Sequence, residues 1–381
     1  MPRIAIRHGR LGDPGPGDPA AAAGLTVGVE EEFLLLDPAT GATLPRAAAI
    51  VAADPPLPPG AKLHRELRLT QVEAATGVCT RARQLREQLV AGRRALAGSA
   101  RLHGAVIASS GTPVLSGPST SENQDGRFGD IDRVYRGMVA DYEACGCHVH
   151  VGVADAETAV AVMNHLRPWL PSLLALSVNS PFDHGRDTGY GSWRMVQQSR
   201  FPGAGIPPYF PDLEAYRAEV RRLADCGALV DESMSFWLVR PSASFPTLEF
   251  RVADAASTVD EAVLQAVLSR ALVRRALADL SDGVPPPEIS GQVAAAALWA
   301  AARDGIDGEG VHACHARRLP AWQLVDELVA HVASTLDETG DRDLVAIVLE
   351  RLRRDGSGAR RQRKAAAAGL PALLATITHQ A

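Results

Sequence analysis

Three consecutive glutamates interrupt an otherwise apolar, strand-like stretch near the start of the chain, in the sequence GVEEEF at residues 28–33. Buried carboxylates cost much free energy unless cations or metal ions neutralise them. Side chains alternate between the two faces of a strand, so Glu30 and Glu32 share one face and Glu31 lies on the other. This pattern predicts either a pair of carboxylates presented to adjacent cations or an exposed edge strand with solvated acids.

Two further acids, Glu66 and Glu73, lie in a second strand-like segment, residues 64–76. A separation of seven positions puts them on opposite faces of an ideal strand, so they act together only if a bulge or turn lies between them. Arg65 and Arg68 stand beside them. Taken alone, this segment therefore indicates ordinary ion pairing.

The sequence CGCHVHVG at residues 145–152 has the residue types of a zinc site. Strand alternation, however, places Cys145 and Cys147 on one face and His148 and His150 on the other, so the four cannot converge on one tetrahedral ion. We interpret the cysteines as small core residues. The histidine pair, flanked by glycines, suits one metal ligand and one substrate or phosphate contact, with buried structural histidines as the alternative.

An acid and an arginine share a face in TLEFRV at residues 247–252, where Glu249 and Arg251 are two positions apart. The two form either a simple ion pair or a site in which the acid binds a cation and the guanidinium binds a phosphoryl group. Arg240, at the end of the preceding strand, and Arg194, after a polar loop, are further candidates for anion contacts.

Composition excludes several classes of protein. The only lysines, Lys62 and Lys364, stand outside any Walker A loop, and no G-x-S-x-G, H-E-x-x-H or G-x-G-x-x-G sequence occurs. A net charge of −5 argues against nucleic acid or an anionic membrane as the main partner. Five cysteines in 381 residues do not suggest a disulfide framework. Without a signal peptide or a long apolar run, we expect a cytoplasmic protein with no membrane segment.

Strand and helix patterns alternate irregularly along the chain, which favours an α+β fold with a largely antiparallel sheet. We expect a mobile leader over residues 1–23 and a single domain over residues 24–381, mostly helical from about residue 258. The predicted strands are residues 25–36, one or two within 64–76, 105–109, 146–153, 235–240 and 247–253. The predicted helices before residue 258 are residues 83–102, 131–143, a kinked pair over 157–179, and 213–224.

Taken in order, these motifs resemble the glutamate–cysteine ligase type 2 family of ATP-dependent carboxylate–amine ligases, called YbdK-like, which is related in fold to glutamine synthetase. The resemblance runs from about residue 24 to residue 363. It is carried by GVEEEF at 28–33, CGCHVHVG at 145–152, LLALSVNSPF at 173–182, DTGYGSWR at 187–194, RPSASFPTLEFRVAD at 240–254 and RQR at 361–363.

The resemblance implies a curved, mainly antiparallel, glutamine synthetase-like sheet with flanking helices, whose concave face holds ATP with Mg²⁺ and the amino-acid substrate. It implies one divalent-ion site of Glu30, His150 and Glu249 and another of Glu32, Glu66 and Glu73. It also implies that Arg251 acts with Glu249 in catalysis. His148, Arg194 and Arg240 remain the candidates, from their own sequence positions, for contacts with ATP or substrate. Mg²⁺ suits these mainly oxygen ligands, with Mn²⁺ as the alternative.

The implied function is an ATP-dependent ligase that forms an amide through a γ-glutamyl phosphate. Its partners are small molecules: ATP, glutamate and an amine such as cysteine. A homo-oligomer is compatible with the sequence and is left open. Two alternatives remain at this point: a metal-dependent hydrolase that uses the same acids and histidine to activate water, and a non-catalytic relative that only binds nucleotide.

Overall fold

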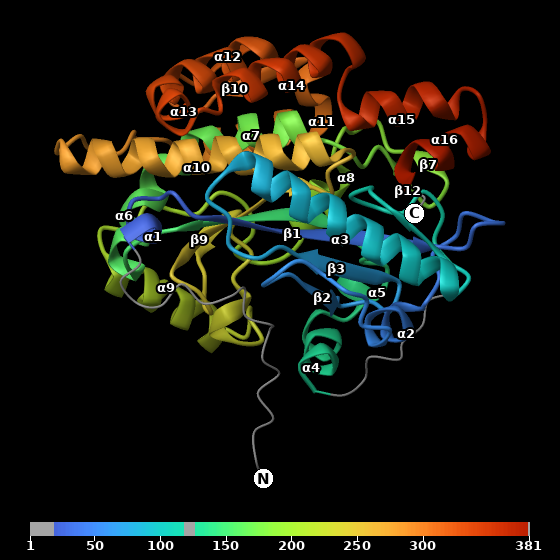
Figure 1. The fold of residues 1–381 in the computed structure, drawn as a ribbon. Helices are drawn as coiled ribbons and strands as arrows, with labels where there is room; N and C mark the ends of the chain where they lie inside the picture. Colours follow the sequence, from blue (N-terminus) through green and yellow to red (C-terminus); the bar gives the residue numbers. More distant parts are fainter. Residues whose placement is uncertain (1–18, 118–125, 380–381) are drawn as a thin grey trace.

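The structure is a computed structural model that describes residues 19–117 and 126–379 (Figure 1). Most of the predicted mobile leader therefore lies outside the described residues. Its last residues form a short helix, α1 (Pro19–Ala22). No helix within the described ranges is long and apolar enough to cross a lipid bilayer.

The centre of the fold is an eight-stranded sheet in which neighbouring strands run antiparallel. The order is β12-β4-β1-β5-β9-β8, and β3 pairs with both β1 and β2. Its strands are β1 (Val27–Leu36), β2 (Lys62–Arg65), β3 (Gln71–Ala75), β4 (Val106–Ala108), β5 (Gly146–Gly152), β8 (Val239–Pro241), β9 (Thr247–Asp254) and β12 (Thr378–His379). The predicted α+β class with a mainly antiparallel sheet is confirmed.

Helices cover one face of this sheet, where α3 (Ala82–Leu102) and α10 (Val259–Ser281) lie across the strands (Figure 1). Val29 and Phe33 of β1 point into the core beneath them. Glu31 lies on the same side, where its carboxylate pairs with Arg93 of α3 at 2.6 Å. The opposite face of β1 carries Glu30 and Glu32, and strand alternation thus separates the middle glutamate from its neighbours as predicted.

The remaining helices surround this unit, and those within residues 291–355 form a helical layer beyond α10 (Figure 1). They are α2 (Ala47–Ala52), α4 (Gly126–Tyr135), α5 (Gly137–Ala140), α6 (Ala156–Leu166), α7 (Leu170–Ser177), α8 (Trp193–Gln198), α9 (Leu213–Asp225), α11 (Gly291–Asp304), α12 (Ala321–His331), α13 (Ala333–Thr339), α14 (Arg342–Asp355), α15 (Gly358–Ala366) and α16 (Leu370–Ile377). Two small hairpins, β6 (Phe182–Asp183) with β7 (Arg186–Asp187) and β10 (Glu309–His312) with β11 (Arg317–Pro320), form separate two-stranded sheets.

Two predicted elements differ from the structure. The helix predicted over 131–143 is two helices, α4 and α5, because Arg136 between them has a φ of 49° and so leaves the helical conformation. The strand predicted over 235–240 is short, because β8 pairs with β9 at three positions only and a 3₁₀ turn precedes it. The kinked helix pair was predicted correctly, with Pro168 in the 3₁₀ segment between α6 and α7.

The pairing of β5 with β9 contains a bulge. Val149 pairs with Phe250, whereas Cys147, two residues earlier, pairs with Ala253, three residues later. One extra residue of β9 is thus accommodated next to Arg251. Bulges change the direction of side chains and are common beside active sites.

Candidate active site

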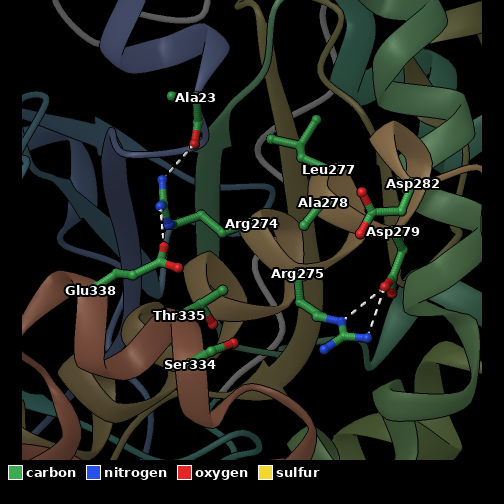
Figure 2. Close-up of a pocket in the computed structure, with 10 residues that line it drawn as sticks. All are labelled: Ala23, Arg274, Arg275, Leu277, Ala278, Asp279, Asp282, Ser334, Thr335 and Glu338. Carbon is green, nitrogen blue, oxygen red and sulfur yellow. Dashed lines mark hydrogen bonds and ion pairs between the residues drawn. The ribbon is translucent and has the colours of Figure 1, made fainter.

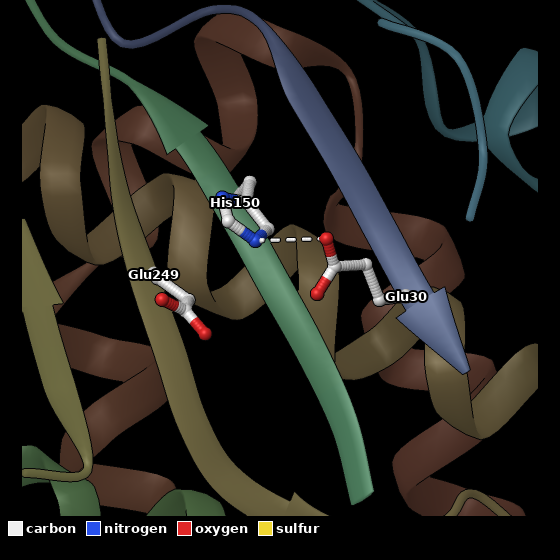
Figure 3. A group of neighbouring side chains, drawn as sticks. All are labelled: Glu30, His150 and Glu249. Atoms are coloured by element: carbon white, nitrogen blue, oxygen red, sulfur yellow. Dashed lines mark ion pairs between the residues drawn. The ribbon is translucent and has the colours of Figure 1, made fainter. Parts of the chain in front are cut away.

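Three strands bring together the first predicted ion site. Glu30 of β1, His150 of β5 and Glu249 of β9 offer ligand atoms that all lie within 4.8 Å of one another (Figure 3). His150 pairs in register with Glu249, and its Nε2 atom lies 3.4 Å from Glu30 Oε1. Burial alone would raise the pKa of Glu30, but the charge of His150 holds it well below its ordinary value. Two carboxylates and an imidazole form a donor set that fits a divalent cation.

The His150 ring is oriented by Thr247. The ring atom Nδ1 lies 2.9 Å from Thr247 Oγ1, while the buried Nε2 forms no hydrogen bond with any described residue. With the hydrogen of Nδ1 pointing to Thr247, Nε2 is the ring nitrogen that can give up its proton and offer its lone pair to a cation. Thr247 is not among the residues predicted from the sequence, although its position two residues before Glu249 on one strand was a usable signal.

Thr247→Val should weaken metal binding by about tenfold, because it removes the hydroxyl that fixes the His150 ring while keeping the β-branched shape. The measurement is the Mg²⁺ concentration for half-maximal ADP formation. Thr76→Val is the matched control, since Thr76 is a buried threonine of the same region that accepts a hydrogen bond from the Val29 amide. An unchanged Mg²⁺ requirement in Thr247→Val would contradict the orienting role.

The residues of the second predicted ion site also lie close together. Glu32, Glu66 and Glu73 offer carboxylate oxygens within 4.8 Å of one another. Glu32 and Glu73 face each other across β1 and β3, and Glu66 joins them because a turn follows β2. The turn between Glu66 and Glu73 that their spacing required is therefore present.

Local ion pairing does not explain the acids of this segment. Arg65 is exposed, and Arg68 lies 3.3 Å from Asp132 and bonds the carbonyl of Val139. Instead, burial raises the pKa of Glu32 to about 8, and the charge of Glu66 acts in the same direction. Burial and the neighbouring acids also raise the pKa of Glu73 well above its ordinary value. Three carboxylates that repel one another fit a hard divalent cation.

The raised pKa values predict a pH-dependent response to Mg²⁺. The folded chain keeps protons on Glu32 and Glu73 that the unfolded chain has lost, so its stability falls as pH rises from the ordinary value of 4.5 towards about 8. Divalent cations bind carboxylates in their deprotonated form. We expect the rise in Tm on adding Mg²⁺ to be larger at about pH 8 than at about pH 6. Glu73→Gln should reduce the difference between the two rises. An equal rise at both pH values would contradict this.

The predicted arginines border the first site. Arg240 Nε lies 2.9 Å from Glu249 Oε2, and Arg251 pairs with the other oxygen of the same carboxylate. Burial would raise the pKa of Glu249, but these two guanidinium groups hold it well below its ordinary value. Arg194 is 2 % exposed, and its Nη2 atom donates to the carbonyl of Arg251 at 3.1 Å. The three arginine side chains thus lie on the same face of the sheet as the acids.

His148 lies between the two sites. Its Nδ1 atom is 3.7 Å from Glu30 Oε2 and 3.8 Å from Glu32 Oε1. In the part of the chain that the structure describes, neither ring nitrogen forms a hydrogen bond. Burial, reinforced by the charge of Arg251, lowers the pKa of His148 to about 4. A neutral imidazole with free nitrogens next to both clusters fits the predicted contact with substrate or phosphate.

The cysteine assignments need one correction. Cys147 is buried with Val149 on the helical side of the sheet, as predicted. Cys145 is also a buried core residue, but it packs with Leu34 on the opposite side. The alternation argument fails at this position because Cys145 precedes the first residue of β5 and is not held by its pleat.

A cavity of about 390 Å³ lies between α10 and α13, away from the acidic strands (Figure 2). Both of its arginines pair with acids of the lining: Arg274 with Glu338, and Arg275 with Asp279. None of the predicted site residues lines it. We therefore place the candidate active site on the acidic face of the sheet.

Solved structures with the same fold define the class of this molecule. It superposes on the glutamate–cysteine ligase of Francisella tularensis in complex with AMP with a TM-score of 0.64, at 14% sequence identity over 92% of this chain and 87% of that chain. A bifunctional glutathione synthetase of Pasteurella multocida gives a TM-score of 0.66 at 14% identity, over 92% of this chain and 51% of that chain. The fold is therefore of the glutamate–cysteine ligase type, with a glutamine synthetase-like sheet.

The chain belongs to the glutamate–cysteine ligase family 2, whose pattern matches residues 26–373. A Saccharopolyspora erythraea protein named "Putative glutamate--cysteine ligase 2-2" is 54% identical over 372 residues, which cover 96% of this chain and 95% of the relative. A Salinispora arenicola protein named "Putative glutamate--cysteine ligase 2" is 45% identical over 343 residues, or 90% of each chain. The resemblance identified from the motifs is confirmed.

Proposed function

We propose that this protein is an ATP-dependent carboxylate–amine ligase that activates the side-chain carboxylate of glutamate and joins it to an amine, with cysteine as the first amine to test. The observation that carries the proposal is the pair of three-residue clusters on one face of the sheet, bordered by Arg251. Membership of the glutamate–cysteine ligase family 2 supports the same chemistry. The same family membership disfavours the alternative function, a metal-dependent hydrolase.

The proposed reaction has two steps. A carboxylate oxygen of the acid attacks the γ-phosphorus of ATP, and the bond to the bridging oxygen breaks to release ADP. The amine nitrogen then attacks the acyl carbon of this acyl phosphate, the bond from carbon to the phosphoryl oxygen breaks, and phosphate leaves as the nitrogen loses a proton. Phosphorylation is needed because hydroxide is a poor leaving group and phosphate is a good one.

Divalent ions, Mg²⁺ by preference and Mn²⁺ as the alternative, would be held by Glu30, His150 and Glu249 and by Glu32, Glu66 and Glu73. They would neutralise the phosphate charge. Arg251 binds the γ-phosphoryl group as it transfers, and its ion pair with Glu249 keeps its side chain on the reacting face. Arg240 binds Glu249 from the other side. His148 and Arg194 contact the substrates.

The location, the partners and the domain organisation of the protein are also proposals. We propose a cytoplasmic location, small-molecule substrates as the partners, and residues 24–381 as one catalytic domain. The number of copies in the active assembly is left open, with a homo-oligomer among the options.

The test is to incubate the purified protein with ATP, Mg²⁺, glutamate and a panel of amines, and to follow ADP and new amides by mass detection. A ligase predicts ADP release that depends on the amine. A hydrolase predicts turnover without ATP, and a nucleotide-binding relative predicts binding without ADP formation. Either of the last two results would contradict the proposal.

A further inference from the structure

Asp254, the last residue of β9, is a fully buried carboxylate that none of the predicted ion sites includes. Its carboxylate accepts three hydrogen bonds, from the backbone N–H of Asn179 at 2.9 Å and from the hydroxyls of Ser180 and Ser192 at 2.7 Å each. Among the described residues, the cation paired with it is Arg194, whose Nη1 atom lies 3.9 Å from Oδ1. A buried anion with this many partners is expensive to build and points to a specific role.

The bulge in β9 puts Asp254 on the acidic face. Without the bulge, alternation from Glu249 would turn Ala253 to that face and Asp254 towards the helices. Instead, Ala253 is in the core under the helices, and Asp254 pairs with Gly146 next to the acidic face. The extra residue beside Arg251 therefore brings a further carboxylate behind the site.

The hydrogen bonds of Asp254 fix the first turn of α8, which carries Arg194. Ser192 is the N-cap of α8, and its hydroxyl accepts from the Met195 amide while it donates to Asp254. The Ser180 hydroxyl accepts from the Arg194 amide at 3.1 Å and also donates to Asp254. Asp254 thus holds the backbone of Arg194 through two serines and faces its guanidinium directly.

The Arg194 guanidinium is packed against the strand that carries the histidines. A Cβ atom added at Gly146 would lie 2.5 Å from Arg194 Nη2 and 2.9 Å from His148 Nε2, so only glycine leaves room for both groups. Two guanidinium nitrogens, Nε and Nη1, are buried and form no hydrogen bond with residues 19–117 or 126–379. A buried cation with unused donors beside Glu32 and Arg251 is suited to receive an anionic ligand group.

We propose that Asp254 is a positioning residue that holds Arg194 so that its guanidinium binds a carboxylate of the acid substrate. The inference rests on the proposed function. It adds a residue that does not touch substrate itself and acts through Arg194. Its removal should therefore weaken binding of the acid and leave binding of ATP less affected.

The test is a double-mutant cycle on the full chain with Asp254→Asn, Arg194→Met and the double variant. Asparagine fits the site, because its side-chain oxygen still accepts hydrogen bonds and its side-chain nitrogen donates one to a serine hydroxyl. For each variant, glutamate affinity is measured by calorimetry with Mg²⁺ and a non-hydrolysable ATP analogue. KM for glutamate, KM for ATP and kcat are measured where turnover remains.

We expect Asp254→Asn to weaken glutamate binding by about tenfold and to add almost nothing in the Arg194→Met background, because the two residues act as one unit. Asp341→Asn is the matched control. Asp341 is another buried carboxylate paired with an arginine, Arg270, at 2.6 Å, but it lies in the helical layer. The Asp341→Asn substitution should lower Tm and leave glutamate affinity unchanged.

Additive effects of Asp254→Asn and Arg194→Met, or a normal glutamate affinity in Asp254→Asn with only a lowered Tm, would overturn the inference and leave the proposed function standing. An absence of amine-dependent ADP formation in the wild-type protein would overturn the proposed function, and the inference with it. The wild-type assay thus separates the two failures.

Discussion

Glu249→Gln is expected to reduce amine-dependent ADP formation by more than about tenfold at saturating Mg²⁺, a loss above about 1.4 kcal/mol in the activation free energy. The substitution keeps the size of the side chain but removes the charge that the proposed ion requires. It also leaves Arg240 and Arg251 without their shared carboxylate. Initial rates of ADP release over a range of Mg²⁺ concentrations measure the effect.

The matched control for this variant is Glu309→Gln, because Glu309 is exposed on β10 and pairs with Arg318 at the surface. We expect normal turnover from the control. Circular dichroism and Tm establish whether Glu249→Gln is folded. A folded Glu249→Gln protein that keeps more than about a tenth of wild-type activity would show that Glu249 is not a direct ligand of the ion.

Arg251→Lys is expected to lower kcat by about a hundredfold or more, with a smaller change in KM for ATP. Lysine keeps the positive charge but loses the planar fork of donors, so binding of the γ-phosphoryl group during transfer suffers most. The measurement is kcat, KM for ATP and Tm on one preparation, so that stability and catalysis are compared directly.

A purely structural role for Arg251 predicts a different pattern. If the residue only pairs with Glu249, Arg251→Lys should lower Tm while the folded fraction keeps a normal kcat. Arg353→Lys is the control, because Arg353 is also an arginine in an ion pair, with Asp326 on the surface of the helical layer. It should change neither kcat nor KM.

The sequence predicted the acidic face well because strand alternation is a strong constraint. Glu30 and Glu32 lie on one face and Glu31 pairs with Arg93 on the other, as the two-residue period requires. The grouping of the two ion sites came from the family resemblance, and the structure places the same residues together. Their roles in binding ions stay predictions.

Interruptions of regular structure were harder to predict. Alternation failed at Cys145, which lies just outside β5, and it could not place Asp254, because the bulge in β9 is set by pairing with β5 across the sheet. The break at Arg136 likewise depends on one residue with a positive φ rather than on the apolar pattern. The sequence shows two consecutive apolar residues here, Val252 and Ala253, and in the structure both enter the core.

The most direct test of the central claim is oxygen transfer from the acid to phosphate. Glutamate labelled with ¹⁸O in its side-chain carboxylate is incubated with the protein, ATP, Mg²⁺ and the best amine from the panel, and the released phosphate is analysed by mass spectrometry. The acyl phosphate mechanism predicts one carboxylate oxygen in each phosphate released. Phosphate that carries no label from glutamate, while ADP and amide accumulate, would contradict it.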